Sequence, residues 1–467
     1  MPDAFMHAIL LACGLLLIGF ALRAGVGLLR VLYVPAAVVG GVVGLGLIQG
    51  LLRVDAIAGF ATEVSGVLSK WPGFLISVVF AGLLLERSSK SLADTAVGTA
   101  KQGVVAWLII LGQVTVGLLT VLLVLKPLGL LDADVPGSFG QLIETGFAGG
   151  HGTAAAMGEV FASLDFTAGR DLGFFFATYG LIYGTLSGIV LVNIGVRAGW
   201  LAQRSGETAD LQTADLQTAA DTGLEPRRAP KPVAFGRVGG QVIDPFVFQV
   251  LIVGAALGVG YGLQQLFLAA TGLVATERAM GFIDNIPLFL FALVGGWIVR
   301  EVLHAMKLGD LIDPPSVQRI IGFAMEFLIV AAIASLRVEA IATYFAPAVV
   351  LLIVGSLWAI VGLVVIGRWL LPRDYWFELG LINYGMSTAT TAQGMLLLRI
   401  VDRDLDTPAA ETYAAAAPLT APFIGGGILT VAGFPALIAY VGLAATAGIC
   451  LAGMAMLLVM GYFLRNR

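Results

Sequence analysis

The stretch GSFGQLIETGFAGGHGTAAAMGEVF, residues 137–161, interrupts a chain that otherwise consists largely of long apolar runs. Because it is rich in glycine and polar residues, it cannot form an uninterrupted apolar helix. Residues 103–125 and 172–196 flank it, and each has the length of a helix that crosses a bilayer, about 20 residues. The fold therefore depends on how an interrupted segment is held between membrane helices.

The composition is typical of a membrane protein. Of the 467 residues, 58% are hydrophobic and only 12% are charged, against roughly 25% charged in a soluble domain. The net charge of −4 includes no basic domain of the kind that binds nucleic acid. The two cysteines, Cys13 and Cys450, lie in apolar runs far apart and indicate neither a disulfide framework nor a zinc site. We expect an all-α polytopic membrane protein.

Apolar windows bounded by charges or turn residues predict five crossings in each half of the chain. Those of the first half are residues 4–22, 31–52, 71–85, 103–125 and 172–196, of which the first is too long and too acidic at its start for a signal peptide. Those of the second half are residues 245–270, 286–302, 320–336, 347–371 and 414–440. A second interrupted polar stretch, residues 377–400, falls where the first half has residues 137–161, and a further apolar run covers residues 442–464.

The domain organisation follows from this order. We expect an N-terminal membrane repeat over residues 1–196, a cytoplasmic linker over 197–240, a C-terminal membrane repeat over 241–440 and an additional helix over 441–467. The linker contains TADLQTADLQTA (208–219), whose polar composition favours disorder or a short surface helix.

Positive charge favours re-entrant hairpins for the two interrupted stretches. If both return to the face they enter from, 20 of the 26 Lys and Arg residues fall on one side, as the positive-inside rule requires. Five crossings per half is odd, so the second half would be inverted relative to the first. Weak internal similarity between GTAAAMG (152–158) and TTAQGML (390–396), and prolines at 35 and 287 that open corresponding spans, agree with an inverted repeat.

Non-helical backbone at bilayer depth is tolerated only against protein or a wet cavity, so the hairpins mark the candidate site. In the first hairpin, glycines permit a tight turn, and a half-helix with Thr153 near its start would direct its positive end at an anionic group. The predicted substrate-binding residues there are Gly149, Gly150, His151, Gly152 and Thr153. In the second hairpin they are Ser387, Thr388, Thr390, Thr391 and Arg399. The alternative is that the small residues only allow close helix packing.

Ionisable and polar groups inside the predicted spans are costly and call for a partner or a role. The sodium-ligand candidates are Glu144, Thr145, Asn383 and Glu326. For Glu326, pairing with Arg319 or Arg399 is the alternative. His151 either bonds a substrate carboxylate or fixes the hairpin, and Glu159 is expected to face water. Arg399 either binds a second carboxylate or extends to the interface.

Three motifs resemble those of the bacterial sodium/glutamate symporter family. TGFAGGHGTAAAM (145–157) is similar to the family's Gly-Gly-His-Gly-Thr loop, VPAAVVGG (34–41) to its proline-opened second span, and FATYGLIYGTLSG (176–188) to the glycine-rich span that follows the loop. The second hairpin departs from the family pattern, because Thr390 stands where the family has a proline in Thr-Pro-Thr-Ala.

The resemblance implies glutamate uptake driven by a sodium gradient, two inverted domains, a homodimer and elevator-like movement of the hairpin-bearing part. No nucleotide-binding motif is present, so we expect a secondary carrier in the bacterial inner membrane, not an enzyme, with Na⁺ as coupling ion and no other cofactor. The partners are a small anionic amino acid and the lipid bilayer. The alternative is a sodium-coupled carrier of another carboxylate, or a cation/proton antiporter. A channel filter and a paired nucleophile and base are both missing from the sequence.

Overall fold

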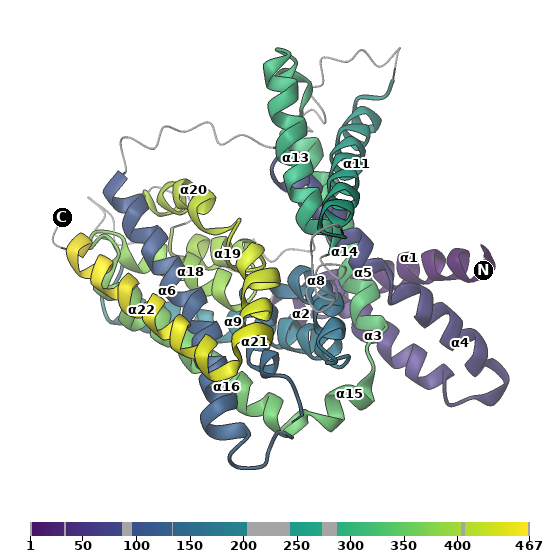
Figure 1. Cartoon of the computed structure of the whole chain (residues 1–467), viewed down its shortest axis with the longest axis horizontal. Helices are drawn as coiled ribbons and strands as arrows, with labels where there is room; N and C mark the ends of the chain where they lie inside the picture. Colours follow the sequence, from purple (N-terminus) through teal and green to yellow (C-terminus); the bar gives the residue numbers. More distant parts are fainter. Residues whose placement is uncertain are drawn as a thin grey trace. The chain divides into compact units, whose positions relative to one another are not determined.

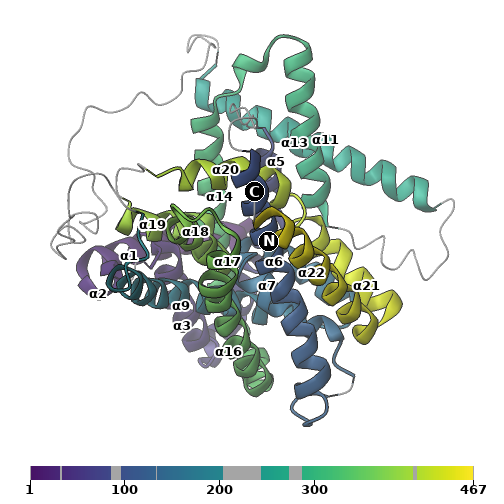
Figure 2. The same cartoon turned by 90° about the vertical axis from the view of Figure 1, so that its left-hand side faces the viewer.

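A computed structural model describes residues 2–31, 34–85, 96–132, 134–202, 243–272, 287–402 and 407–465. Within these ranges all regular structure is helical (Figures 1 and 2), as the composition predicts. Nine helical stretches of the described chain are long and apolar enough to cross a membrane. The predicted linker lies almost entirely outside the described residues.

The chain divides into two compact units, and each unit takes helices from both halves of the sequence. Unit 1 contains α1 (Pro2–Gly25), α3 (Ala36–Leu51), α4 (Asp55–Leu68), α5 (Trp71–Leu83), α11 (Pro245–Gly272), α13 (Leu288–Ala305), η3 (Gly309–Leu311) and α14 (Pro314–Ala334).

Unit 2 begins in sequence with α2 (Gly27–Val31), α6 (Ala96–Thr120), η1 (Val121–Leu125), η2 (Gly137–Gln141), α7 (Leu142–Gly146), α8 (Gly150–Ser163) and α9 (Gly169–Arg197). Its second part contains α15 (Val338–Thr343), α16 (Phe345–Val361), η4 (Gly362–Gly367), α17 (Arg368–Leu370), α18 (Trp376–Thr388), α19 (Thr391–Val401), α20 (Ala409–Thr420), η5 (Leu429–Gly433), α21 (Phe434–Val441) and α22 (Leu443–Arg465).

Unit 1 is built on close helix crossings at glycine. In the α1–α3 pair, a Cβ added to Gly40 would lie 2.2 Å from the carbonyl oxygen of Leu15. In the α11–α13 pair, a Cβ added to Gly295 would lie 2.2 Å from the carbonyl oxygen of Ala256. Only glycine allows two backbones to approach this closely, which is how membrane helices gain packing contacts without a hydrophobic driving force.

Unit 2 is centred on α6, which is apolar around most of its circumference. Of the 18 residues in its most apolar stretch, 72% are buried. This is the pattern of a helix that is surrounded by other helices. α22 lies alongside it (Figures 1 and 2), and α16 and α20 also pack on it. The additional C-terminal helix predicted from the sequence therefore packs on α6 as part of unit 2, with one of its faces buried.

Corresponding helices in the two halves share local features. Pro35 and Pro287 immediately precede α3 and α13 with nearly the same backbone angles, φ −60°, ψ 145° and φ −65°, ψ 146°. α6 and α16 both continue into a π-helical segment, η1 and η4. Each of these two helices is followed by an interrupted helical pair, α7–α8 in the first half and α18–α19 in the second.

Three predicted crossings differ from the observed helices. The crossing predicted over residues 71–85 is the 13-residue α5, and α4 before it was not predicted; together they form one candidate span, Asp55–Leu83. The crossing predicted over residues 31–52 is the 16-residue α3, about 24 Å long, because Pro35 starts the helix late. The crossing predicted over 414–440 is broken between α20 and η5. Gly425 and Gly426 adopt φ values of 65° and 98° there, which a right-handed helix cannot contain.

Gly40→Ala should lower the melting temperature of the purified protein, since the added methyl would meet the backbone of α1 and overpacking costs about 1–3 kcal/mol. Gly46→Ala is the matched control: it lies on the same helix with nothing within 4 Å of an added Cβ. It should be neutral or stabilising because alanine is the better helix former. Equal melting temperatures for the two variants would contradict the close α1–α3 crossing.

Candidate functional site

The first interrupted stretch folds as a helical hairpin within unit 2. One arm is η2 followed by α7, the chain turns at residues 147–149, and α8 forms the other arm. Gly150 has φ +64°, a left-handed conformation that a residue with a Cβ resists. α8 starts at this glycine, so Thr153 lies in its first turn and the backbone N–H groups of that turn are directed at the tip.

The second interrupted stretch also folds as a helical hairpin, with α18 and α19 as its arms and Ala389 and Thr390 at its tip. The arms touch at Gly385, where an added Cβ would lie 2.4 Å from Cα of Gly394. Thr390 caps α19 by accepting a hydrogen bond from the backbone N–H of Gln393 at 3.2 Å. Its φ of −151° is closed to proline, whose ring holds φ near −65°.

The two hairpin tips meet, although about 240 residues of sequence separate them. A Cβ placed on Gly150 would lie 3.0 Å from the carbonyl oxygen of Ala389. Both tips therefore bring their helix breaks to one place in unit 2. The tip residues predicted from the sequence, at 149–153 and 387–391, are brought close together here, whereas Arg399 lies at the far end of α19.

α9 holds both hairpins through a row of glycines on one face. Gly173 contacts Ala154 of the first hairpin, and Gly180 and Gly184 contact Thr388 of the second. A Cβ on Gly180 would lie 2.3 Å from the carbonyl oxygen of Thr388. The glycine-rich run at 176–188 is thus a packing surface on which the second tip rests.

His151 is anchored to α9. Its Nε2 lies 3.1 Å from the hydroxyl of Thr178, which donates its own proton to the carbonyl of Phe174 at 2.9 Å. Since that hydroxyl has a single proton, Nε2 of His151 is the donor in the first bond. The ring also stacks at 6.5 Å from Phe174. This geometry corresponds to the reading in which the histidine fixes the hairpin.

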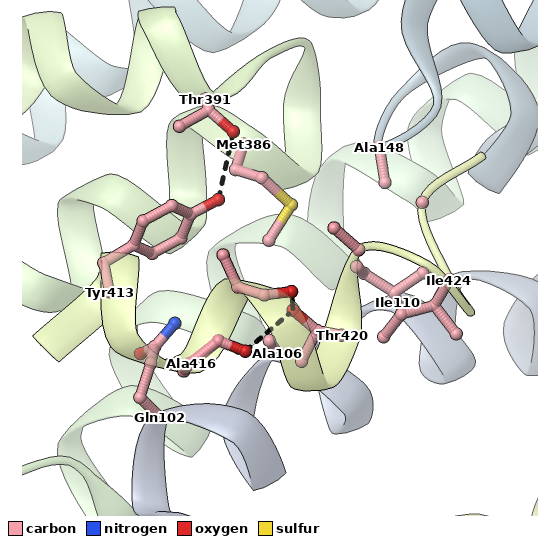
Figure 3. Close-up of a pocket in the computed structure, with 13 residues that line it drawn as sticks. Gln102, Ala106, Ile110, Ala148, Met386, Thr391, Tyr413, Ala416, Thr420 and Ile424 are labelled. Atoms are coloured by element: carbon pink, nitrogen blue, oxygen red, sulfur yellow. Dashed lines mark hydrogen bonds between the residues drawn. The ribbon is translucent and has the colours of Figure 1, made fainter. Parts of the chain in front are cut away.

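Beside the tips lies a cavity of about 200 Å³ (Figure 3). Ala148 of the first hairpin and Met386 and Thr391 of the second border it. The remaining lining residues come from α6, from α20 and from the break after α20: Gln102, Ala106, Ile110, Tyr413, Ala416, Ala417, Thr420, Ala421, Ile424 and Gly425. The Thr391 hydroxyl lies 3.1 Å from the Tyr413 hydroxyl at one side of the cavity (Figure 3).

Buried amides tie the second hairpin to α6. Gln102 and Asn383 exchange two hydrogen bonds of 2.8 Å, each side chain donating to the other. Asn383 also donates to the carbonyl of Leu379 at 3.0 Å. Gln113 donates to the carbonyl of Ser387, at 2.6 Å, one turn before the tip. Asn383, a sodium candidate by sequence, thus has both amide groups engaged in positioning the hairpin.

Glu144 is fully buried on α7 and binds the broken helix that follows α20. Its Oε1 accepts a hydrogen bond of 3.0 Å from the backbone N–H of Gly425 and one of 2.6 Å from the hydroxyl of Thr430. Sequence reasoning missed this partner segment. The signal was present in FIGGGILT (423–430), whose three consecutive glycines mark a break inside an apparent span.

Of the residues predicted from the sequence to bind substrate or sodium, Thr391 borders the cavity and the others do not. Arg399 is exposed in the last turn of α19, and Glu159 is exposed on α8. Glu326 belongs to α14 of unit 1. The cavity lining, within the described residues, contains no charged side chain.

Comparison with known proteins identifies one family. The family model described as sodium/glutamate symporter matches residues 4–392, most of the chain. This match confirms the resemblance found in the sequence motifs. It ends at α19, so α20, the break and α22 lie beyond it. No curated protein matches the chain.

Gln102→Leu and Asn383→Leu should each destabilise the protein, because either change leaves the other amide buried without its partner, at a cost of about 1–3 kcal/mol. The double variant should recover much of the loss, since both polar groups are then removed. Thermal unfolding of all four proteins in detergent measures this. Losses that simply add would contradict the reciprocal pairing.

Proposed function

The chain belongs to the sodium/glutamate symporter family, and from this premise we propose that it is a sodium-coupled carrier that takes up glutamate through the cavity at the hairpin tips. Family membership makes the protein a membrane transporter. It favours glutamate over another carboxylate, and symport over cation/proton antiport.

The observation that carries the proposal is the meeting of two helix breaks beside a cavity. Gly150 and Ala389 are in contact, and residues from both tips border a volume of about 200 Å³. This exceeds by several times the roughly 30 Å³ that a water molecule occupies in the liquid. In carriers, helices that are broken at the centre of the membrane expose backbone N–H and C=O groups that can bind the substrate and the coupling ion.

The substrate carboxylates are proposed to interact with helix N-termini and hydroxyls. α8 and α19 both begin at the tips, and the N-terminus of a helix carries about half a positive charge. The hydroxyls of Thr391 and Tyr413 add hydrogen-bonding groups at the cavity. The proposed substrate-binding set is the one expected from the sequence: residues 149–153 of the first tip, and Ser387, Thr388, Thr390 and Thr391 of the second. A role for Arg399 as carboxylate partner stays a prediction.

Na⁺ is the proposed coupling ion, with Glu144, Thr145, Asn383 and Glu326 as the ligands expected from the sequence. Glu144 and Thr145 lie on α7 of the first hairpin. Asn383 lies on α18, where Gln102 already uses both of its amide groups.

The proposed mechanism is an elevator-like movement of unit 2, which carries both hairpins, against unit 1 as the scaffold. The matched order of helices, the paired prolines and the paired π-helical segments support an internal repeat. The inverted orientation, the homodimer and residence in a bacterial inner membrane complete the proposal.

Purified protein in liposomes should accumulate glutamate when an inward sodium gradient is imposed, because the family couples these two solutes. A proton gradient of equal size should not replace it. Radiolabelled glutamate uptake, with choline in place of sodium as the control, measures this. Uptake that is indifferent to sodium would reject the proposal.

Thr153→Ala and Thr391→Ala should each reduce uptake by about fivefold or more while sparing expression, since each removes a hydroxyl from a hairpin tip, and one hydrogen bond is worth about 1 kcal/mol or more. Thr62→Ala is a matched control: this hydroxyl on α4 bonds only the carbonyl of Ala58, in unit 1. Full uptake in both tip variants would remove the hairpin tips from the site.

A further inference from the structure

One arm of the first hairpin carries four fully buried polar side chains with unsatisfied oxygens. Ser138 and Gln141 lie on η2, and Glu144 and Thr145 on α7. Within the described residues, four of their oxygens have no hydrogen-bond partner: Ser138 Oγ, Gln141 Oε1, Glu144 Oε2 and Thr145 Oγ1. Gln141 is three residues from Ser138, three from Glu144 and four from Thr145, so each of the other three side chains is a neighbour of Gln141 on the helical segment.

Such a cluster is exceptional in a protein interior. Buried polar atoms are nearly always hydrogen-bonded, and each unsatisfied one costs about 1–3 kcal/mol, more when it is charged. Oε2 of a carboxylate and Oε1 of an amide are both acceptors, so they cannot satisfy one another. A cation satisfies carboxylate, amide and hydroxyl oxygens at the same time.

The surrounding hydrogen bonds leave these oxygens free for a ligand. The side-chain nitrogen of Gln141 donates to the carbonyl of Thr430 at 3.5 Å, which turns its Oε1 away from that carbonyl. Oε1 of Glu144 is held by the backbone N–H of Gly425 and the hydroxyl of Thr430. Thr430 is itself fixed by accepting from the N–H of Gly426 at 3.1 Å. The second carboxylate oxygen of Glu144 is thereby the unsatisfied one.

We propose that Ser138, Gln141, Glu144 and Thr145 bind one monovalent alkali cation, which is Na⁺ if the proposed function holds. All four contribute oxygen, the ligand that hard cations prefer. Three ligands are neutral and one is a carboxylate, so the single negative charge of the site neutralises the single positive charge of a monovalent cation. A divalent ion would leave one positive charge uncompensated in the interior, which is costly.

The broken helix links this cation site to the substrate cavity. Gly425 donates its N–H to Glu144 and also lines the cavity. Thr420 and Ile424, in the same stretch of chain, line it too. A cation that holds Glu144 in place therefore holds one wall of the cavity. Through this wall, occupancy of the cation site raises the affinity for substrate, and by linkage substrate raises the affinity for the cation.

Thr145→Val tests the site because a cation ligand and a residue that only packs would respond differently to this change. The change keeps the shape and removes only a hydroxyl without a partner. If the hydroxyl has no ligand, its removal leaves stability unchanged or improves it at every sodium concentration. If it binds the cation, stability without sodium is kept or improved, but the sodium concentration that half-saturates the melting shift rises about tenfold.

The measurement is the melting temperature of the purified full chain against NaCl, with choline chloride at constant ionic strength and no glutamate. Ser138→Ala should behave as Thr145→Val does, and Glu144→Gln should abolish the sodium-dependent shift. Thr446→Val is the matched control: this buried hydroxyl on α22 already donates to the carbonyl of Gly442, and its loss should leave the sodium midpoint unchanged.

Three results would overturn the cation site: no sodium-dependent shift in the unmodified protein, unchanged midpoints in both Thr145→Val and Ser138→Ala, or a shift that persists in Glu144→Gln. These results are separable from the transport assay. Sodium-driven glutamate uptake with an unchanged Thr145→Val midpoint rejects the site and keeps the function. A tenfold-shifted midpoint without glutamate uptake keeps the site and rejects the function.

Discussion

A helix that breaks where water is absent must find protein partners for its freed backbone groups, and unit 2 meets this constraint three times. The first break is the turn at residues 147–149, where the N–H of Gly149 donates to the carbonyl of Glu144 on α7 at 2.8 Å. At the second tip, the carbonyl of Ser387 accepts from Gln113. At the third break, the Glu144 carboxylate accepts from Gly425. The third break is thus stabilised by the hairpin that contains the first.

This mutual support accounts for polar residues that would otherwise be a liability in a membrane. Gln102 and Gln113 are buried on α6, the central helix of unit 2, and each is used to hold the second hairpin. His151 performs the same task for the first hairpin by bonding Thr178 of α9. The glycine face of α9 provides the space in which both hairpins come close enough for these bonds.

The same arrangement suggests why a carrier would use broken helices. The break after α20 is held by the buried Glu144 carboxylate, which accepts from Gly425. The same stretch of chain forms a wall of the cavity. A cation at Glu144 and a solute in the cavity would then act on one short segment. Coupling between the two would need no long pathway, because both would bias the same backbone.

The class of the protein and the location of two of its helix breaks could be predicted from the amino-acid sequence alone. Low charge and long apolar runs require membrane helices, and the glycines at 149–152 and the hydroxyls at 387–391 mark positions where such helices stop. These are local properties, so they can be read from periodicity and composition. The motifs around 145–157 also sufficed to indicate the family.

Which polar residue bonds which partner could not be predicted before the packing of the helices was known. Gln102 and Asn383 are 281 residues apart, as are Glu144 and Gly425, and no local pattern connects them. The apolar run at 414–440 indicated an intact crossing, but Gly425 and Gly426 break it where the first hairpin provides an acceptor. A helix break is stable only when a distant segment satisfies it, and that segment is specified by the packing of the whole unit.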